Sequence, residues 1–178
     1  PCMQDLPGID MSSGSLGQGI SAAVGMAIAG KLDNADYRVY TLLGDGEIQE
    51  GQVWEAAMFA GFHKLDNLVL IVDNNGLQID GKIEDVCSPY PIDEKFRAFN
   101  FHVIDVADGN DMEQLRQAFA EARSTKGMPT AIIAHTVKGK GVSFMEDQAG
   151  WHGKAPNDEE YQIAMADLER IGEALCQK

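Results

Sequence analysis

Two polar side chains in the sequence have the types and spacing to bind one divalent cation together. Asp45 follows the apolar segment 38–44 in a Gly-Asp-Gly triplet, and Asn75 follows the apolar segment 67–73 in Asn-Asn-Gly. A carboxylate and an amide carbonyl are hard oxygen ligands, which Mg²⁺ or Ca²⁺ prefers. Phosphate oxygens would complete the shell, because Gly46 has no side chain to block a phosphate and the next helix adds N–H donors.

The segments around these residues predict the elements that position them. Apolar and β-branched runs predict strands, and helical spacing of apolar residues predicts helices. The expected strands are 38–44, 67–73, 101–106 and 129–135, and the expected helices are 15–31, 52–62, 111–123 and 157–175. Their alternation predicts a single α/β domain over residues 1–178, with a mainly parallel sheet and helices on both faces. Open α/β sheets bind ligands at the carboxyl ends of their strands, where Asp45 and Asn75 are expected as neighbours.

Local signals also predict how the helices begin and which sides they bury. Ser12 or Ser13 is available to cap helix 15–31. Capping boxes are expected where an Asx residue precedes Gln or Glu by three positions, as in Asp111 with Gln114 and Asn157 with Glu160. The side chains expected to face inward from the last two helices are Met112, Leu115, Phe119 and Ala122, then Tyr161, Ala164, Leu168, Ile171 and Leu175.

Composition excludes several classes of function. The 178 residues include 14 Lys and Arg against 28 Asp and Glu, a net charge of −14, so the chain has no basic face for nucleic acid. No apolar run approaches the roughly 18 residues of a membrane span, and no signal-peptide pattern opens the chain, so we expect a soluble cytoplasmic protein with no membrane partner. Cys2, Cys87 and Cys176 are widely spaced and odd in number, which favours free thiols.

Each of the two polar motifs also suits an ordinary turn, because Gly, Asn and Asp tolerate positive φ. Their combination, with a helix and a strand between them, is more specific and is typical of thiamine diphosphate enzymes. The runs PGIDMSSGSLGQGI, GDGEIQEGQVWEAAMFAGFHKLDNLVLIVDNNGLQIDG and TVKGKGVSFMEDQAGWHGKAP resemble the transketolase family, in order, over most of residues 1–156. The chain is similar only to the diphosphate-binding domain of that family and not to its pyrimidine-binding domain.

The resemblance implies a thiamine diphosphate cofactor and assigns roles by position. Asp45 and Asn75 are implied as ligands of Mg²⁺ (or Ca²⁺), with the backbone carbonyl of Leu77 as a third ligand, and Gly46 and Asn75 as contacts of the diphosphate. The other implied positions are Gly14, Ser15 and Leu16 lining the thiamine pocket, Lys138 beside the cofactor, His152 contacting cofactor and sugar, and Glu50 linking two cofactor sites across an interface. His152 and Glu50 are thus the catalytic candidates.

Simpler roles compete with some of these assignments. Lys138 is also explained as a solvated loop cation, and Glu50 as a charge that stabilises a helix N-terminus. The Gly-Gln-Gly spacing at 17–19 also suits close helix packing. His135 ends a strand on the ligand side and is a further candidate. Structural roles are expected for Trp151, as a packing anchor, and for His63 and His102.

The chain departs from the family pattern at its start. A Gly-His-Pro triplet precedes the PGVDM-like segment in the family, and Pro1 resembles its last residue, so the family's catalytic His is expected outside this sequence. The glutamate that protonates the aminopyrimidine belongs to the pyrimidine-binding domain. We therefore expect the N-terminal subunit of a split transketolase, completed by a pyrimidine-binding partner subunit in a heterotetramer, or a homodimer of this chain in isolation.

The implied reaction moves a two-carbon ketol unit from a ketose phosphate to an aldose phosphate, with sugars such as xylulose 5-phosphate and ribose 5-phosphate as substrates. Alternatives within the same cofactor class are a 1-deoxyxylulose-5-phosphate synthase and a dihydroxyacetone synthase. An alternative of another class is a non-catalytic regulatory module that keeps the cofactor half-site.

Overall fold

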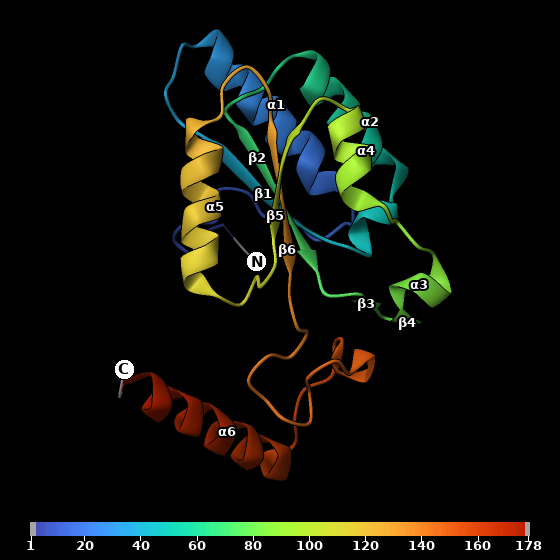
Figure 1. Ribbon diagram of the computed structural model, residues 1–178, viewed down its shortest axis with the longest axis vertical. Helices are drawn as coiled ribbons and strands as arrows, with labels where there is room; N and C mark the ends of the chain where they lie inside the picture. The colour runs from blue at the N-terminus through green and yellow to red at the C-terminus, as the bar shows by residue number, and fades with distance from the viewer. Residues whose placement is uncertain (1–2, 177–178) are drawn as a thin grey trace.

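A parallel four-stranded sheet forms the centre of the computed structural model, which describes residues 3–176 (Figure 1). Its strands, in spatial order, are β1 (Val39–Gly44), β2 (Leu68–Asn74), β6 (Thr130–His135) and β5 (His102–Val106). Every neighbouring pair is parallel. The predicted α/β architecture is confirmed. Pro1 and Cys2, on which two sequence predictions rest, lie outside the described residues.

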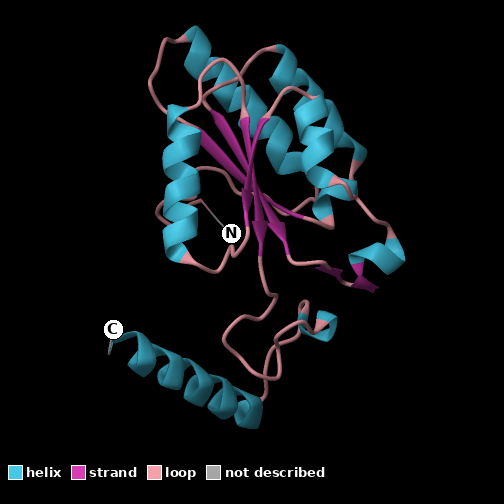
Figure 2. Ribbon diagram, viewed as in Figure 1, coloured by secondary structure: helices cyan, strands magenta, loops and turns pink. Residues whose placement is uncertain are grey.

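Helices cover both faces of this sheet (Figure 2). The helices α1 (Gln18–Leu32), α2 (Gly51–Phe62) and α4 (Ile92–Ala98) pack on one face, and α5 (Met112–Ser124) packs on the other. Successive side chains of a strand point to opposite faces, so Leu68, Leu70 and Val72 of β2 join the first core while Val69 joins the second. β2 is therefore buried on both sides, which explains its continuous apolar sequence.

Short elements follow the carboxyl ends of the strands. They are η1 (Glu47–Gln49), β3 (Leu77–Gln78), β4 (Gly81–Lys82), α3 (Ile83–Val86) and η2 (Ala149–Trp151). β3 and β4 form an antiparallel hairpin, and η2 lies against β4. No sequence pattern predicts these elements or α4, because segments of this length are too short for a periodic pattern to identify.

The start of α1 differs from its prediction. The helix begins at Gln18 rather than Ser15, and its N-cap is Gly17, with φ of 76° and no side-chain cap. Neither Ser12 nor Ser13 caps it; Ser12 instead accepts a hydrogen bond from the N–H of Met3 at 2.9 Å. The other predicted boundaries lie within one residue of the observed ones.

The two predicted capping boxes have different outcomes. Asn157 and Glu160 form a reciprocal box at the start of α6 (Asp158–Cys176), with side chain to backbone distances of 2.9 and 2.8 Å. Asp111 caps α5 by accepting from the N–H of Glu113 at 2.8 Å. The Gln114 side chain, however, accepts from the N–H of Asp108, so Asp111 and Gln114 do not form a reciprocal capping box.

The predicted inward face of α6 is wrong. This helix lies apart from the sheet (Figure 1), beside the loop after β6, where the N–H of Ser143 donates to Asp167 at 2.9 Å. Of the side chains expected inside, only Ala164 is buried, while Tyr161, Leu168, Ile171 and Leu175 are exposed, as is Met112 of α5. The period of a helix identifies its apolar side but not the surface that covers it.

No helix within residues 3–176 is both long enough and apolar enough to cross a membrane. Cys87 and Cys176 are exposed free thiols, as predicted.

Candidate functional site

Asp45, directly after β1, is a buried carboxylate held by backbone N–H groups. Its side chain is 1% exposed, Oδ1 accepts from the N–H of Gly46 at 2.9 Å, and Oδ2 accepts from the N–H of Gly76 at 2.6 Å. Burial raises the pKa of this carboxyl, and the nearby Asp73 carboxylate raises it further, against the lowering effect of the N–H groups. No ion pair joins Asp45 to a basic residue among the described residues. A cation at this position would stabilise the charged form.

The turn after β2 holds the second predicted ligand. The Asn75 amide donates from Nδ2 to Oδ1 of Asp73 at 3.2 Å, and its Oδ1 accepts from the N–H of Leu77 at 3.1 Å. These bonds fix which way the amide points. Because Asp45 bonds to Gly76 between these two residues, its carboxylate lies at the same turn as Asn75 and Leu77. Their role as metal ligands stays a prediction.

Residues 3–176 contain no group of three or more His, Cys, Asp or Glu side chains that could hold a metal ion. A cation beside Asp45 would therefore need other oxygen ligands as well, such as amide, backbone or phosphate oxygens. Ca²⁺ and Mg²⁺ accept such mixed oxygen sets.

Gly46 is constrained by its neighbours rather than by its backbone conformation. Its φ of −68° is open to any residue. A methyl group in place of its hydrogen would come within 3.2 Å of Cβ of Gln78 in β3. Gln49 of η1 also donates to the Gln78 amide at 2.6 Å, so η1 and β3 pack together directly beside the Asp45 turn.

The predicted thiamine-pocket residues Gly14, Ser15 and Leu16 lie in an exposed loop directly before α1. This loop is joined to η1, because the N–H of Gly17 donates to Oε1 of Glu47 at 3.0 Å. A methyl group at Gly17 would come within 2.8 Å of Cβ of Glu50, so the loop also touches the start of α2. Glu50 itself is exposed and makes no cap hydrogen bond to α2.

Lys138 and His152 lie in the loop between β6 and α6. Lys138 is half-buried and His152 is exposed, and neither side chain forms a hydrogen bond or ion pair with another residue in the described range. Trp151 anchors the loop, as predicted, by donating to the Phe144 carbonyl at 3.0 Å. Because η2 lies against β4, His152 follows a segment next to the hairpin. The structure does not bring either side chain into bonding contact with Asp45 or Asn75.

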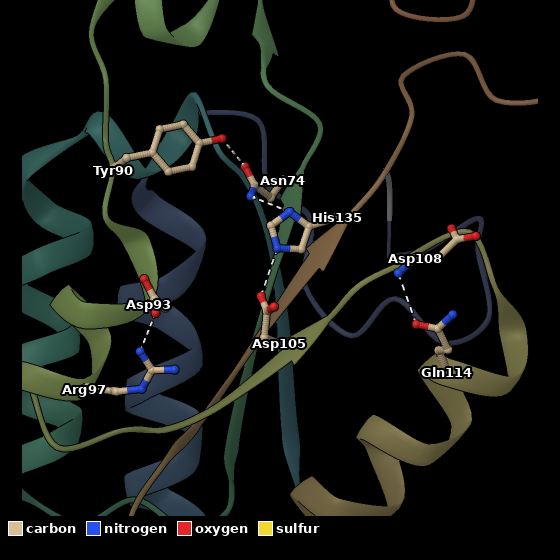
Figure 3. A network of polar contacts seen from close by, with 8 residues as sticks. All are labelled: Asn74, Tyr90, Asp93, Arg97, Asp105, Asp108, Gln114 and His135. Carbon is tan, nitrogen blue, oxygen red and sulfur yellow. Dashed lines mark hydrogen bonds and ion pairs between the residues drawn. The ribbon is translucent and has the colours of Figure 1, made fainter.

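A second polar cluster, which no sequence pattern predicts, lies at the carboxyl ends of the neighbouring strands β2, β6 and β5 (Figure 3). The Tyr90 hydroxyl donates to Oδ1 of Asn74 at 2.6 Å. Nδ2 of Asn74 lies 3.2 Å from Nδ1 of His135, and Nε2 of His135 lies 2.9 Å from Oδ1 of Asp105. When the His135 ring is neutral and carries its proton on Nε2, every donor in this series of four side chains meets an acceptor.

The second cluster lines a cavity of about 290 Å³ that also includes the Asp93–Arg97 ion pair of α4. Burial raises the pKa of the Tyr90 hydroxyl, and the Asp45 carboxylate adds to the effect, so Tyr90 keeps its proton as a donor. Asn74 and His135 meet because they are register partners on β2 and β6. A His at the end of a strand was the only sequence signal for this cluster.

The two remaining histidines have structural surroundings, as expected. The His63 ring packs on Phe59 and Phe62, with centroids 4.2 and 5.0 Å away. Nε2 of His102 lies 2.7 Å from Oε1 of Glu121 at the opposite edge of the sheet.

Residues 1–169 match the family model "Transketolase, thiamine diphosphate binding domain". The chain is 44% identical over 170 residues to the 6-deoxy-6-sulfo-D-fructose transketolase subunit SqwG of Clostridium sp. (strain MSTE9), covering 96% of the chain and 62% of that protein. It is 45% identical over 168 residues to an apulose-4-phosphate transketolase subunit of Phocaeicola vulgatus, covering 94% and 59%. The chain therefore spans about three-fifths of the length of these relatives.

Among solved structures, a transketolase from Campylobacter jejuni is similar with a TM-score of 0.85 and 34% identity. The similarity covers 91% of this chain and 26% of that one.

Proposed function

The chain belongs to the transketolase family and carries its thiamine diphosphate binding domain, and on that premise we propose that it is one subunit of an enzyme that transfers a two-carbon ketol unit between sugars. The observation that carries the proposal is the buried Asp45 carboxylate at the Asn75 turn. A buried anion with no cationic partner is costly, and a divalent cation bound to a diphosphate would supply that partner.

The residues at this turn fit such a cation. Asp45, the oriented amide of Asn75 and the backbone carbonyl of Leu77 would hold Mg²⁺ (or Ca²⁺), and Gly46 and Asn75 would contact the diphosphate. Thiamine diphosphate, when bound, supplies the carbanion chemistry needed to break and form a bond beside a carbonyl. The protein supplies position and charge.

Other side chains are proposed to surround the cofactor and the sugar. Gly14, Ser15 and Leu16 would line the thiamine, and Leu16, at 61% exposed, is an apolar side chain that such contact would cover. Lys138 would provide local positive charge and His152 hydrogen bonds near an anionic sugar. Local positive charge is needed there because the chain as a whole carries a net charge of −14. His152 would hydrogen-bond both the cofactor and a sugar oxygen.

The substrates proposed are a ketose donor and an aldose phosphate acceptor. Two relatives are named for 6-deoxy-6-sulfo-D-fructose and apulose-4-phosphate, sugars with a sulfo or phosphate group. We therefore propose that the donor carries an anionic group, as the phosphate of a sugar phosphate does. The specific sugars xylulose 5-phosphate and ribose 5-phosphate stay predictions.

A partner subunit is proposed to supply the pyrimidine-binding domain. Two relatives are named as transketolase subunits, which supports an enzyme made of separate chains. Helix α2, which begins after Glu50, exposes Met58, Phe59 and Phe62, an apolar surface suited to an interface. The assembly proposed is a heterotetramer, with Glu50 as the interface glutamate, and a homodimer in the absence of the partner.

Reconstitution tests the proposed function. The chain is mixed with a candidate pyrimidine-binding subunit, thiamine diphosphate, Mg²⁺, a defined ketose phosphate and ribose 5-phosphate, and the products are identified by mass. We expect ketol transfer that requires all components. Products of another type would indicate one of the other thiamine diphosphate activities, and cofactor binding without turnover would indicate a regulatory module.

A further inference from the structure

The Glu47 carboxylate bridges two segments that lie far apart in the sequence, since its hydrogen bond to Gly17 spans 30 residues. Its Oε1 accepts from the N–H of Gly17 at 3.0 Å, and its Oε2 accepts from the N–H of Gly44 at 3.1 Å. Gly17 is the N-cap of α1 and directly follows the loop 14–16, while Gly44 ends β1 and directly precedes Asp45. One side chain therefore joins the loop proposed for thiamine to the strand end proposed for the metal.

Within residues 3–176, the acceptor found for both N–H groups is the Glu47 side chain. The N-cap of α1 is a glycine, which has no side chain of its own to accept a hydrogen bond. β1 is an edge strand, and the N–H of Asp45 donates toward β2, to the carbonyl of Asp73 at 3.1 Å. Because successive N–H groups of a strand point to opposite sides, that of Gly44 points away from β2, where Glu47 accepts it. A carboxylate beside a helix N-terminus is also favoured by the helix dipole.

We infer that Glu47 is a positioning residue that sets the distance between the loop 14–16 and Asp45. The strand end is also held without Glu47, by the bonds of Asp45 to Asp73, Gly46 and Gly76. The loop residues Gly14, Ser15 and Leu16 are exposed and depend more on the Gly17 bond. Loss of the bridge should thus move the loop and leave the strand end in place. This inference rests on the proposed function, because it assigns the bridged segments to one cofactor.

Two ligands that contact different parts of the site distinguish a displaced loop from a displaced strand end. Inorganic pyrophosphate with Mg²⁺ would engage only the Asp45 turn, whereas thiamine diphosphate with Mg²⁺ would also engage the loop 14–16. Binding of each to the whole chain is measured by calorimetry for the wild type and for Glu47→Gln, whose amide places a donor against one of the two N–H groups. We expect the Kd for thiamine diphosphate to rise about tenfold, as for the loss of a charge-assisted hydrogen bond, and that for pyrophosphate to change less than about threefold.

Asp66→Asn is the matched control. The Asp66 carboxylate ties the other end of α1 to the opposite edge of the sheet, through an ion pair with Lys31 and a 2.9 Å bond from the N–H of Gly127. Its loss should lower the melting temperature without changing the ratio of the two Kd values. Glu47→Asp keeps the charge but shortens the arm, so it should also weaken thiamine diphosphate binding selectively.

The outcomes are distinct. A selective loss of thiamine diphosphate binding in both Glu47 variants supports the inference. Equal losses for both ligands, or no loss, overturn it and leave the proposed function standing. A wild-type chain that binds neither ligand overturns the proposed function and this inference together. If Glu47→Gln does not fold, Glu47→Asp alone decides between the first two outcomes.

Discussion

Two polar clusters lie at the same edge of the sheet and differ in how far their own residues satisfy them. In the second cluster, Tyr90, Asn74, His135 and Asp105 form a continuous series of hydrogen-bond contacts, in which each donor meets an acceptor when the neutral His135 ring carries its proton on Nε2. The first cluster consists of Asp45, Asp73 and Asn75. Its buried Asp45 carboxylate accepts backbone bonds but has no cationic partner among the described residues, and the nearby Asp73 carboxylate is also negative.

The difference separates residues that support the fold from residues prepared for a ligand. A complete hydrogen-bond chain gains stability from its own geometry and needs nothing further. A buried charge that remains uncompensated costs stability until a ligand of opposite charge arrives. The adjacent residues Asn74 and Asn75 belong to different clusters. Asn74 is part of the second cluster and Asn75 is part of the first.

The largest expected effect is on ligand binding at the first cluster. Asp45→Asn keeps the shape of the side chain but removes the charge that would hold the cation, so we expect thiamine diphosphate affinity in Mg²⁺ to fall about a hundredfold, or about 2.8 kcal/mol. Calorimetry on the whole chain measures this loss. Asp105→Asn, at the second cluster, is the control and should leave the affinity unchanged; equal losses in the two variants would remove the distinction between the clusters.

Substitutions of the neighbouring residues Asn74 and Asn75 should affect different quantities, the first mainly stability and the second mainly cofactor binding. Asn74→Ala deprives the Tyr90 hydroxyl and the His135 ring of their shared partner, which should cost about 1–3 kcal/mol of unfolding free energy. Asn75→Ala should cost less stability but weaken thiamine diphosphate binding about tenfold, because it removes a proposed metal ligand. Urea denaturation and calorimetry on both variants give the two quantities. The comparison fails if Asn74→Ala impairs binding more than Asn75→Ala does.

A smaller effect is expected from Tyr90→Phe. The variant keeps the ring and removes only the hydroxyl that donates to Asn74, so unfolding free energy should fall by about 0.5–1.5 kcal/mol. Cofactor affinity should not change. Urea denaturation measures the first quantity, and a Tyr90→Phe protein as stable as the wild type would show that the second cluster adds little to the fold.

The smallest expected effect is on the pH dependence of stability, and it arises from Glu113, a residue outside both clusters. Hydrogen bonds from Arg116 and Gln117 lower the pKa of Glu113 on α5 from 4.5 to about 2. Because the folded pKa is depressed, this contribution to stability is present above pH 4.5 and is lost as the pH falls toward 2. Glu113→Gln should therefore make the stability of the protein slightly less dependent on pH in that window, as followed by thermal melts. A steeper dependence in the variant would contradict this assignment.

Much of the fold could be predicted because its signals are local. The apolar runs of β1 and β2, the amphipathic α5 and the capping box at Asn157 each depend on residues close together in the sequence. The places of Asp45 and Asn75 at the ends of neighbouring strands followed from the same patterns. Elements too short for a period, such as η1 and β3, left no such signal.

The sequence by itself determined the alternation of strands and helices, and with it the edge at which the polar residues gather, because strand and helix periods are properties of neighbouring residues. Only the tertiary structure decided that Glu47 joins Gly17 to Gly44, that Asn74 meets His135 across β2 and β6, and that α6 leaves its apolar side exposed. These contacts join segments far apart in the chain, and they depend on register and packing, which no local pattern encodes.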